Sequence, residues 1–141
     1  MAAVTSVMRA QQILLARVDA VLRPLHLTFA RYEVLMLLSF SSHGEMPLSR
    51  LGARLQVHPT SVTNAIDRLE AKGLIERRPH ESDRRALVAV ILPPGRTLAD
   101  KATAALNARV FDEPGLRSEE AGELVAVLRV LRSNAGDFST G

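Results

Sequence analysis

Residues 48–73 read LSRLGARLQVHPTSVTNAIDRLEAKG, and this stretch decides the fold. Its apolar residues recur at three- and four-residue steps, the spacing of amphipathic helices, on both sides of a short break at Gln56-Val57-His58. Pro59 suits the first turn of the second helix, because that position needs no backbone N–H. Gly73 suits the left-handed residue that follows a helix end. Two short helices joined by a tight turn predict a helix-turn-helix.

The inner and outer faces of these two helices follow from the same spacing. In the first helix we expect three leucines to face inward, with Gly52 allowing a neighbour to approach closely: Leu48, Leu51 and Leu55. In the second helix the expected inward positions are Val62, Ala65, Ile66 and Leu69. The residues left on its outer face are polar: Ser61, Thr63, Asn64, Asp67 and Arg68.

Two β-strands are predicted directly after this helix. Residues 74–78 (LIERR) and 86–92 (ALVAVIL) have the length of strands, and the second is rich in β-branched side chains. The polar segment 79–85 between them forms the charged tip of a hairpin, and residues 93–95 (PPG) end the second strand. A helix-turn-helix followed by a hairpin is a winged helix.

Further helices flank this unit on both sides. Apolar residues spaced as in a helix run from Val4 to Leu25, with Pro24 near the end, and Thr28 is a good cap for a second helix. Residues 41–47 are expected to form a loop. A helix over about 96–110, a turn at 114–115 and a last helix capped by Ser118 complete the chain. The predicted fold is mainly α with a small β-hairpin wing.

Composition limits what the chain can be. Its 141 residues make about one domain, and 47% of them are hydrophobic, enough for a buried core. No cysteine is present, which excludes disulfides, zinc–thiolate sites and thiol redox sensing by this chain. The longest apolar run, residues 86–92, is too short to cross a membrane, and no export signal is apparent. We therefore expect a cytoplasmic protein with no membrane partner.

The positive charge is concentrated in the middle of the chain. Residues 47–96 hold nine Lys and Arg against five Asp and Glu, whereas the remainder holds nine against ten. Since the winged helix occupies this basic segment, we expect double-stranded DNA as its partner. The expected DNA contacts come from both helices and the hairpin: Arg50, Arg54, Thr60, Ser61, Thr63, Asn64, Arg68, Arg77, Asp83, Arg84 and Arg85. Arg84 or Arg85 would enter the minor groove, and Asp83 would pair with one of them and fix its direction.

Several segments together resemble the MarR family of bacterial transcriptional regulators. They are residues 27–28 (LT), 34–35 (VL), 51–55 (LGARL), 61–63 (SVT), 66–75 (IDRLEAKGLI), 83–85 (DRR) and 95–96 (GR). The resemblance implies a homodimer with intertwined terminal helices, a pseudo-palindromic operator and, often, repression relieved by a small lipophilic or phenolic ligand. It also implies that Ser61, Thr63, Asn64 and Arg68 lie on the recognition helix. Because Asn64 stands where the family often has arginine, the base preference of other members does not carry over.

A dimer also follows without the family. The first helix and the last two each carry an apolar stripe that so short a chain has little material to cover, so a second copy is the economical solution. The alternative is a monomer whose long helices pack on each other. We expect residues 1–27 to be an N-terminal dimerisation helix, 28–95 the DNA-binding domain and 96–141 the C-terminal dimerisation helices.

Other functions compete with DNA binding. No histidine pair has metal-ligand spacing and no glycine-rich phosphate loop is present, so neither an enzyme, a metal site nor a cofactor is predicted. The alternative function is a winged-helix protein-interaction module without sequence-specific DNA binding, which would not need a cluster of wing arginines. A ligand pocket, if present, would lie where the dimerisation helices meet the winged domain. Its polar candidates are Arg9, Arg17, His26, Arg31 and Tyr32.

Overall fold

A computed structural model describes residues 1–55 and 59–137. Its helices are α1 (Ala2–Leu22), α2 (Phe29–Phe40), α3 (Leu48–Leu55), α4 (Pro59–Ala71), α5 (Pro93–Leu106) and α6 (Ser118–Asn134). Its strands are β1 (Glu45–Pro47), β2 (Ile75–Pro79) and β3 (Leu87–Ile91). Short helical segments are η1 (Arg23–Leu25), η2 (Ser42–Gly44) and η3 (Asn107–Phe111), the last a π-helix that continues α5. The winged helix predicted from the sequence is confirmed.

The helix-turn-helix has the predicted inner faces. Leu51 of α3 is fully buried, and Leu48 and Leu55 pack partly buried against the core. All four expected residues of α4 are buried: Val62, Ala65, Ile66 and Leu69. Pro59 is the first residue of α4, and Gly73 has φ +70°, the left-handed conformation expected beyond the helix end. The predicted break at Gln56-Val57-His58 lies outside the described residues.

The sheet has three strands, one more than predicted. The β2–β3 hairpin is confirmed, and its strands pair antiparallel with Arg77 opposite Ala89. β1 adds to the other edge of β3, with Met46 opposite Ala89, giving the order β1-β3-β2. The expectation of a loop throughout 41–47 was therefore wrong for Glu45–Pro47. Three residues are too few to show strand alternation, and this pairing joins segments far apart in sequence.

The close approach expected at Gly52 occurs at another glycine. Apart from the backbone of its own helix and its chain neighbours, no atom of residues 1–55 and 59–137 lies within 4 Å of the place where a Cβ on Gly52 would stand, so the prediction was wrong for these residues. A Cβ on Gly95 would lie 2.2 Å from the backbone oxygen of Leu74. Only glycine therefore allows the start of α5 to lie against the chain that leaves α4. α5 begins at Pro93, three residues before the predicted start, because proline is well suited to a first helical turn.

Two helices begin with polar contacts at their N-termini. Thr28 caps α2 as predicted, its Oγ1 accepting from the Arg31 N–H at 3.3 Å. Ser118 is the first residue of α6 and not its cap, which corrects the prediction. The cap is Arg117, whose N–H donates to Glu120 Oε2 at 2.9 Å and whose guanidinium binds Glu120 Oε1. These contacts with Arg117 hold the pKa of Glu120 below its usual value.

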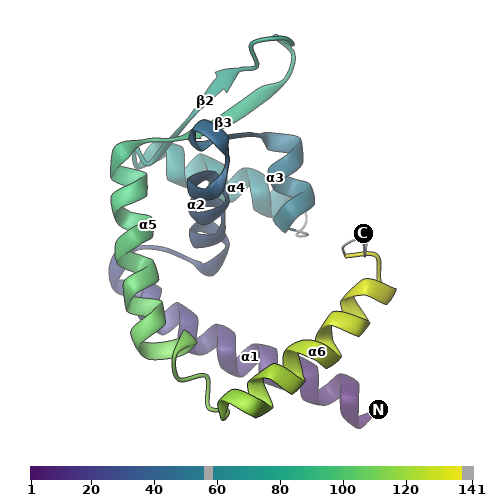
Figure 1. The fold of residues 1–141 in the computed structure, drawn as a ribbon. Coiled ribbons are helices and arrows are strands. Elements are labelled where there is room, and N and C mark those ends of the chain that lie inside the picture. The colour runs from purple at the N-terminus through teal and green to yellow at the C-terminus, as the bar shows by residue number, and fades with distance from the viewer. Residues whose placement is uncertain (56–58, 138–141) are drawn as a thin grey trace.

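α1 and α6 extend away from the body formed by α2–α5 and the sheet (Figure 1). The structure describes every residue of α6, and no residue of this helix is buried. Val127 is 67% exposed and Leu131 57%. An apolar hollow of about 750 Å³ opens between α1, η3 and α6. Its apolar lining includes Val7, Leu14, Leu15, Val110, Phe111, Leu124 and Leu128. The chain by itself leaves this apolar surface open to solvent.

Candidate nucleic-acid interface

The outer face of α4 is polar and accessible. The five residues expected there are exposed, namely Ser61, Thr63, Asn64, Asp67 and Arg68, and so is Thr60, which was expected to contact DNA. Thr63 Oγ1 donates to the Pro59 carbonyl at 3.1 Å, one turn back along the helix. In the described part of the chain, the side chains of Ser61, Asn64 and Arg68 have no partner. Their hydrogen-bonding groups are therefore available to a molecule that lies along α4.

α3 adds two cations beside this face. Arg50 and Arg54 are exposed, and their guanidinium groups contact no carboxylate within residues 1–55 and 59–137. They lie on the helix before α4, as a helix-turn-helix requires for contacts with a DNA backbone.

The hairpin places two arginines at its tip, which projects beyond the helices in Figure 1. Arg84 and Arg85 are exposed and belong to the turn between β2 and β3. The turn is closed by the His80 N–H donating to the Ala86 carbonyl at 2.9 Å and by the Ala86 N–H donating to the Asp83 carbonyl at 3.0 Å. The two guanidinium groups have no carboxylate partner among the described residues.

Asp83 acts on the backbone of the tip. Its Oδ1 accepts from the Arg85 N–H at 3.0 Å. The predicted ion pair between Asp83 and a wing arginine is absent from the part of the chain that the structure describes, so that expectation was wrong. An Asp side chain two residues before an N–H forms a local turn, which satisfies the carboxylate without a guanidinium.

Two further arginines of the wing are already paired. Arg77 forms ion pairs with Asp67 and, at 3.6 Å, with Glu70, both on α4. Arg78 pairs with Glu76 on its own strand. Sequence reasoning placed Arg77 among the DNA contacts and missed its bond to α4. The signal was present, since two acids spaced three apart on α4 precede the arginine by one tight turn.

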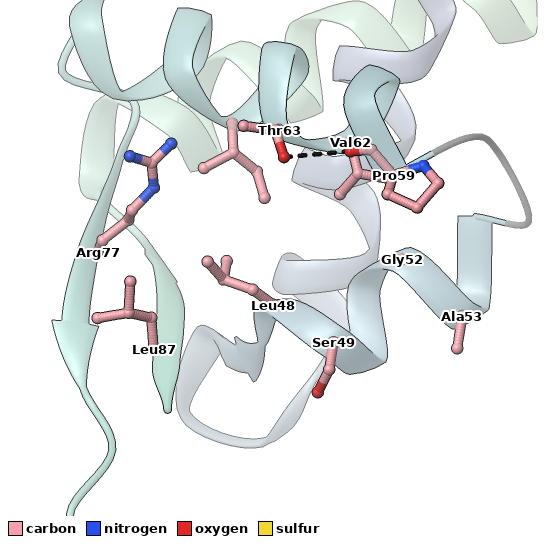
Figure 2. A pocket seen from close by; sticks show the side chains of 10 residues that line it. Leu48, Ser49, Gly52, Ala53, Pro59, Val62, Thr63, Arg77 and Leu87 are labelled. Atoms are coloured by element: carbon pink, nitrogen blue, oxygen red, sulfur yellow. Dashed lines mark hydrogen bonds between the residues drawn. The ribbon is translucent and has the colours of Figure 1, made fainter. Parts of the chain in front are cut away.

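A hollow of about 560 Å³ lies between α3, α4 and the wing (Figure 2). Leu48 and Ala53 line it from α3, Val62 and Ile66 from α4, and Arg77 and Leu87 from the strands. Figure 2 shows Arg77 on the wing strand at the side of the hollow opposite α3. The wing is therefore separated from the two helices here by a space that the sequence did not predict.

The five residues considered for a ligand pocket do not gather around one cavity described here. Arg17 donates to three carbonyls, those of Arg109, Glu113 and Pro114, at 3.1, 2.7 and 3.0 Å. Tyr32 is buried and its hydroxyl lies 2.8 Å from Thr103 Oγ1. The other three are Arg9, which binds Gln12; His26, whose carbonyl accepts from Lys72; and Arg31, which is half-buried. None of the five lines either hollow.

Residues 1–55 and 59–137 contain no group of His, Cys, Asp and Glu able to hold a metal ion. No helix among them has the length and apolar character needed to span a bilayer.

Comparison with known proteins gives a consistent result. Residues 27–87 match the model of the MarR family. The solved structure of Sco5413, a MarR family transcriptional regulator from Streptomyces coelicolor, is 53% identical, with a TM-score of 0.91. The superposition covers 99% of this chain and 96% of Sco5413.

Two further proteins extend the likeness. The HTH-type transcriptional repressor MdtR of Bacillus subtilis is 38% identical over 55 residues, which span 39% of this chain and 36% of MdtR. Sco3205, another MarR family regulator from S. coelicolor, was solved in complex with DNA. It is 23% identical, with a TM-score of 0.80 over 92% of this chain and 83% of Sco3205, and shares the fold.

Proposed function

The chain belongs to the MarR family of transcriptional regulators, and we propose that it acts as a homodimeric repressor that binds a pseudo-palindromic operator. The observation that carries this proposal joins two features of the described residues: a polar outer face on α4 where Ser61, Asn64 and Arg68 have no partner, and two tip arginines without a carboxylate partner. A helix with such a face fits a major groove, and extended guanidinium groups fit the adjacent minor groove. Sco3205, which has this fold, was solved in complex with DNA.

Each side chain has a role that its chemistry suits. Asn64 and Ser61 are placed to read base edges, since an amide pairs well with adenine and a hydroxyl with several bases. Thr60 and Thr63 flank them on the same helix. Arg50, Arg54 and Arg68 suit phosphates, which position the protein without reading sequence. One of Arg84 and Arg85 enters the minor groove, while Asp83 orients the tip through the backbone of Arg85.

The second copy is proposed from the apolar surface that one chain leaves open. Leu124 and Leu128 of α6 line the hollow between α1, η3 and α6, and Val127, Val130 and Leu131 of the same helix are more than half exposed. Exposed apolar side chains gathered in this way mark protein contact surfaces. A twofold partner laid on this surface would cover it. We accordingly assign residues 1–27 and 96–141 to dimerisation and 28–95 to DNA binding, with two recognition helices about one turn of DNA apart.

Release of the operator by a small lipophilic or phenolic effector is a separate part of the proposal. The region where the dimerisation helices meet the winged domain would hold it. Calorimetry with an aromatic carboxylate tests this: heat that disappears in Arg17→Ala or His26→Ala supports an anion contact there. Unchanged heat in variants of Arg9, Arg17, His26, Arg31 and Tyr32 contradicts the assignment of these five residues.

Selection of bound duplexes from a random pool tests the DNA-binding proposal most directly. We expect the enriched sequences to contain two inverted half-sites whose centres are one helical turn apart. The matched control is the double variant Arg84→Ala/Arg85→Ala, which leaves the α4 face intact and should enrich the same half-sites more weakly. A pool that stays random at low ionic strength, or enriched sites without twofold symmetry, contradicts the proposal.

A further inference from the structure

Ion pairs and a hydrogen bond join Arg77 of the wing to α4. Arg77, on the outer strand β2, is bound from α4 by Asp67 and Glu70. Glu70 makes a second bond, its Oε2 accepting from the Arg77 backbone N–H at 2.8 Å. β2 is an edge strand, and this N–H points away from β3 toward the helix. α4 therefore binds both the backbone and the side chain of one wing residue.

Arg77 lies at the edge of the hollow in Figure 2. Between α3, α4 and the wing, about 560 Å³ is not filled by side chains, so close packing does not fix the wing on this side. The paired residues of the two strands end at Pro79 and Leu87, the bond from the His80 N–H to the Ala86 carbonyl follows, and the tip with Arg84 and Arg85 lies farther out. A small rotation of the strands at Arg77 moves the tip by a larger distance.

We propose that Asp67 and Glu70 are positioning residues that hold the wing at a fixed angle to α4, so that the tip arginines and the α4 face meet one duplex together. The proposal rests on the proposed DNA binding and reassigns Arg77 from a DNA contact to the wing side of this link. It deepens that function by naming two acidic residues that the protein needs in order to bind DNA, which is itself an anion.

The proposal makes a prediction opposite in sign to simple electrostatics. Asp67 and Glu70 carry negative charge close to the proposed path of DNA, so their neutralisation alone would strengthen binding and free Arg77 for a phosphate. If the two acids hold the wing, neutralising them weakens binding instead, because the tip loses its fixed place. The relevant variant is Asp67→Asn/Glu70→Gln, which keeps side-chain size and removes both charges.

The position of the wing is measurable without DNA. The chain has no cysteine, so Glu81→Cys in the tip and Ala71→Cys at the end of α4 accept a pair of spin labels cleanly. Labelled chains are diluted with unlabelled chains so that distances within one chain are recorded. We expect a narrow distance distribution in the parent and a broad or shifted one in the double variant. Glu70→Gln, whose amide oxygen can still accept from the Arg77 N–H, should broaden it less than Glu70→Ala.

DNA binding is measured in parallel on the operator found by selection. We expect the double variant to bind about tenfold more weakly, with a shallower dependence on salt because the tip contributes fewer phosphate or groove contacts. Glu76→Gln is the matched control, since it removes an acid paired with Arg78 on the same strand without touching α4. It should leave the distance distribution unchanged.

The outcomes separate the two proposals. An unchanged distance distribution in Asp67→Asn/Glu70→Gln overturns the positioning role, and so does tighter DNA binding with a steeper salt dependence. A parent protein that binds no duplex overturns the proposed function, while the spin-label distances still decide whether the acids fix the wing.

Discussion

α4 and α6 are amphipathic helices of 13 and 17 residues, yet they differ in how much of their apolar face the chain buries. α4 buries its whole apolar stripe within the chain, and Leu69 is fully covered. α6 buries nothing, and Val127 and Leu131 remain more than half exposed. The same sequence pattern therefore marks a helix completed by its own fold in one case and, as we propose, one completed by a second copy in the other.

The difference also assigns the polar faces. Because the apolar side of α4 is satisfied by the core, its polar side is what it offers to a partner, and that partner must hydrogen-bond. In α6 the apolar side is what remains on offer, so a partner there must be apolar. In the proposed function, recognition of DNA and recognition of a second chain are thus carried by opposite sides of similar helices.

The largest expected effect comes from placing a charge on the open side of α6. Leu128→Asp should weaken self-association at least about a hundredfold, since burying an unpaired carboxylate costs several kcal/mol. Sedimentation measures the association. Ala126→Asp is the control, because two residues along a helix of 3.6 residues per turn lie on nearly opposite sides. Equal effects of the two substitutions would contradict a dimer built on the Leu128 side.

Shortening a leucine to alanine should affect thermal stability differently in α4 and in α6, because only the effect in α6 should depend on protein concentration. Leu69→Ala should cost about 2–5 kcal/mol, because it leaves a cavity in the core of the chain itself. Leu131→Ala shortens a side chain that is exposed in the single chain, so its effect on stability should appear only through dimerisation. Thermal unfolding at several protein concentrations is the measurement. The loss for Leu69→Ala should persist at every concentration, and a Leu131→Ala deficit that does not vary with concentration argues against the intermolecular role.

Local patterns predicted most of the winged helix. The inward set of α4, the cap at Thr28 and the left-handed Gly73 each depend on a few neighbouring residues, which the sequence displays directly. The hairpin could be predicted for the same reason, since both strands and their turn lie in one short segment.

Contacts between distant or competing groups were harder to predict. β1 pairs with β3 across more than forty residues, and three residues carry no periodic signal. Gly52 and Gly95 are indistinguishable by residue type, and only the path of the chain after α4 decides which one is crowded. Asp83 had an N–H and a guanidinium within reach, and Arg77 had both DNA and two acids as possible partners. Residue type alone does not rank such alternatives.

Wing substitutions should have a smaller effect than loss of the dimer. Arg84→Ala and Arg85→Ala, made separately, should weaken operator binding by about 1–3 kcal/mol for whichever residue enters the minor groove. Arg78→Ala is the control, since Arg78 is occupied by Glu76. Fluorescence anisotropy with a labelled operator gives the affinities. If neither tip variant weakens binding more than the control, the wing does not insert as proposed.

The smallest expected change is in base preference and not in the affinity for DNA. Asn64→Ala removes the amide that we propose reads a base, so it should relax selection at one position in each half-site. Arg54→Ala removes a proposed phosphate contact on α3, so it should weaken specific and random duplexes alike and lower the salt dependence by about one ion. Competition binding with single-base operator variants measures both. Equal losses on operator and random DNA for Asn64→Ala would move this residue from base reading to backbone contact, because only a group facing a base edge can distinguish the two duplexes.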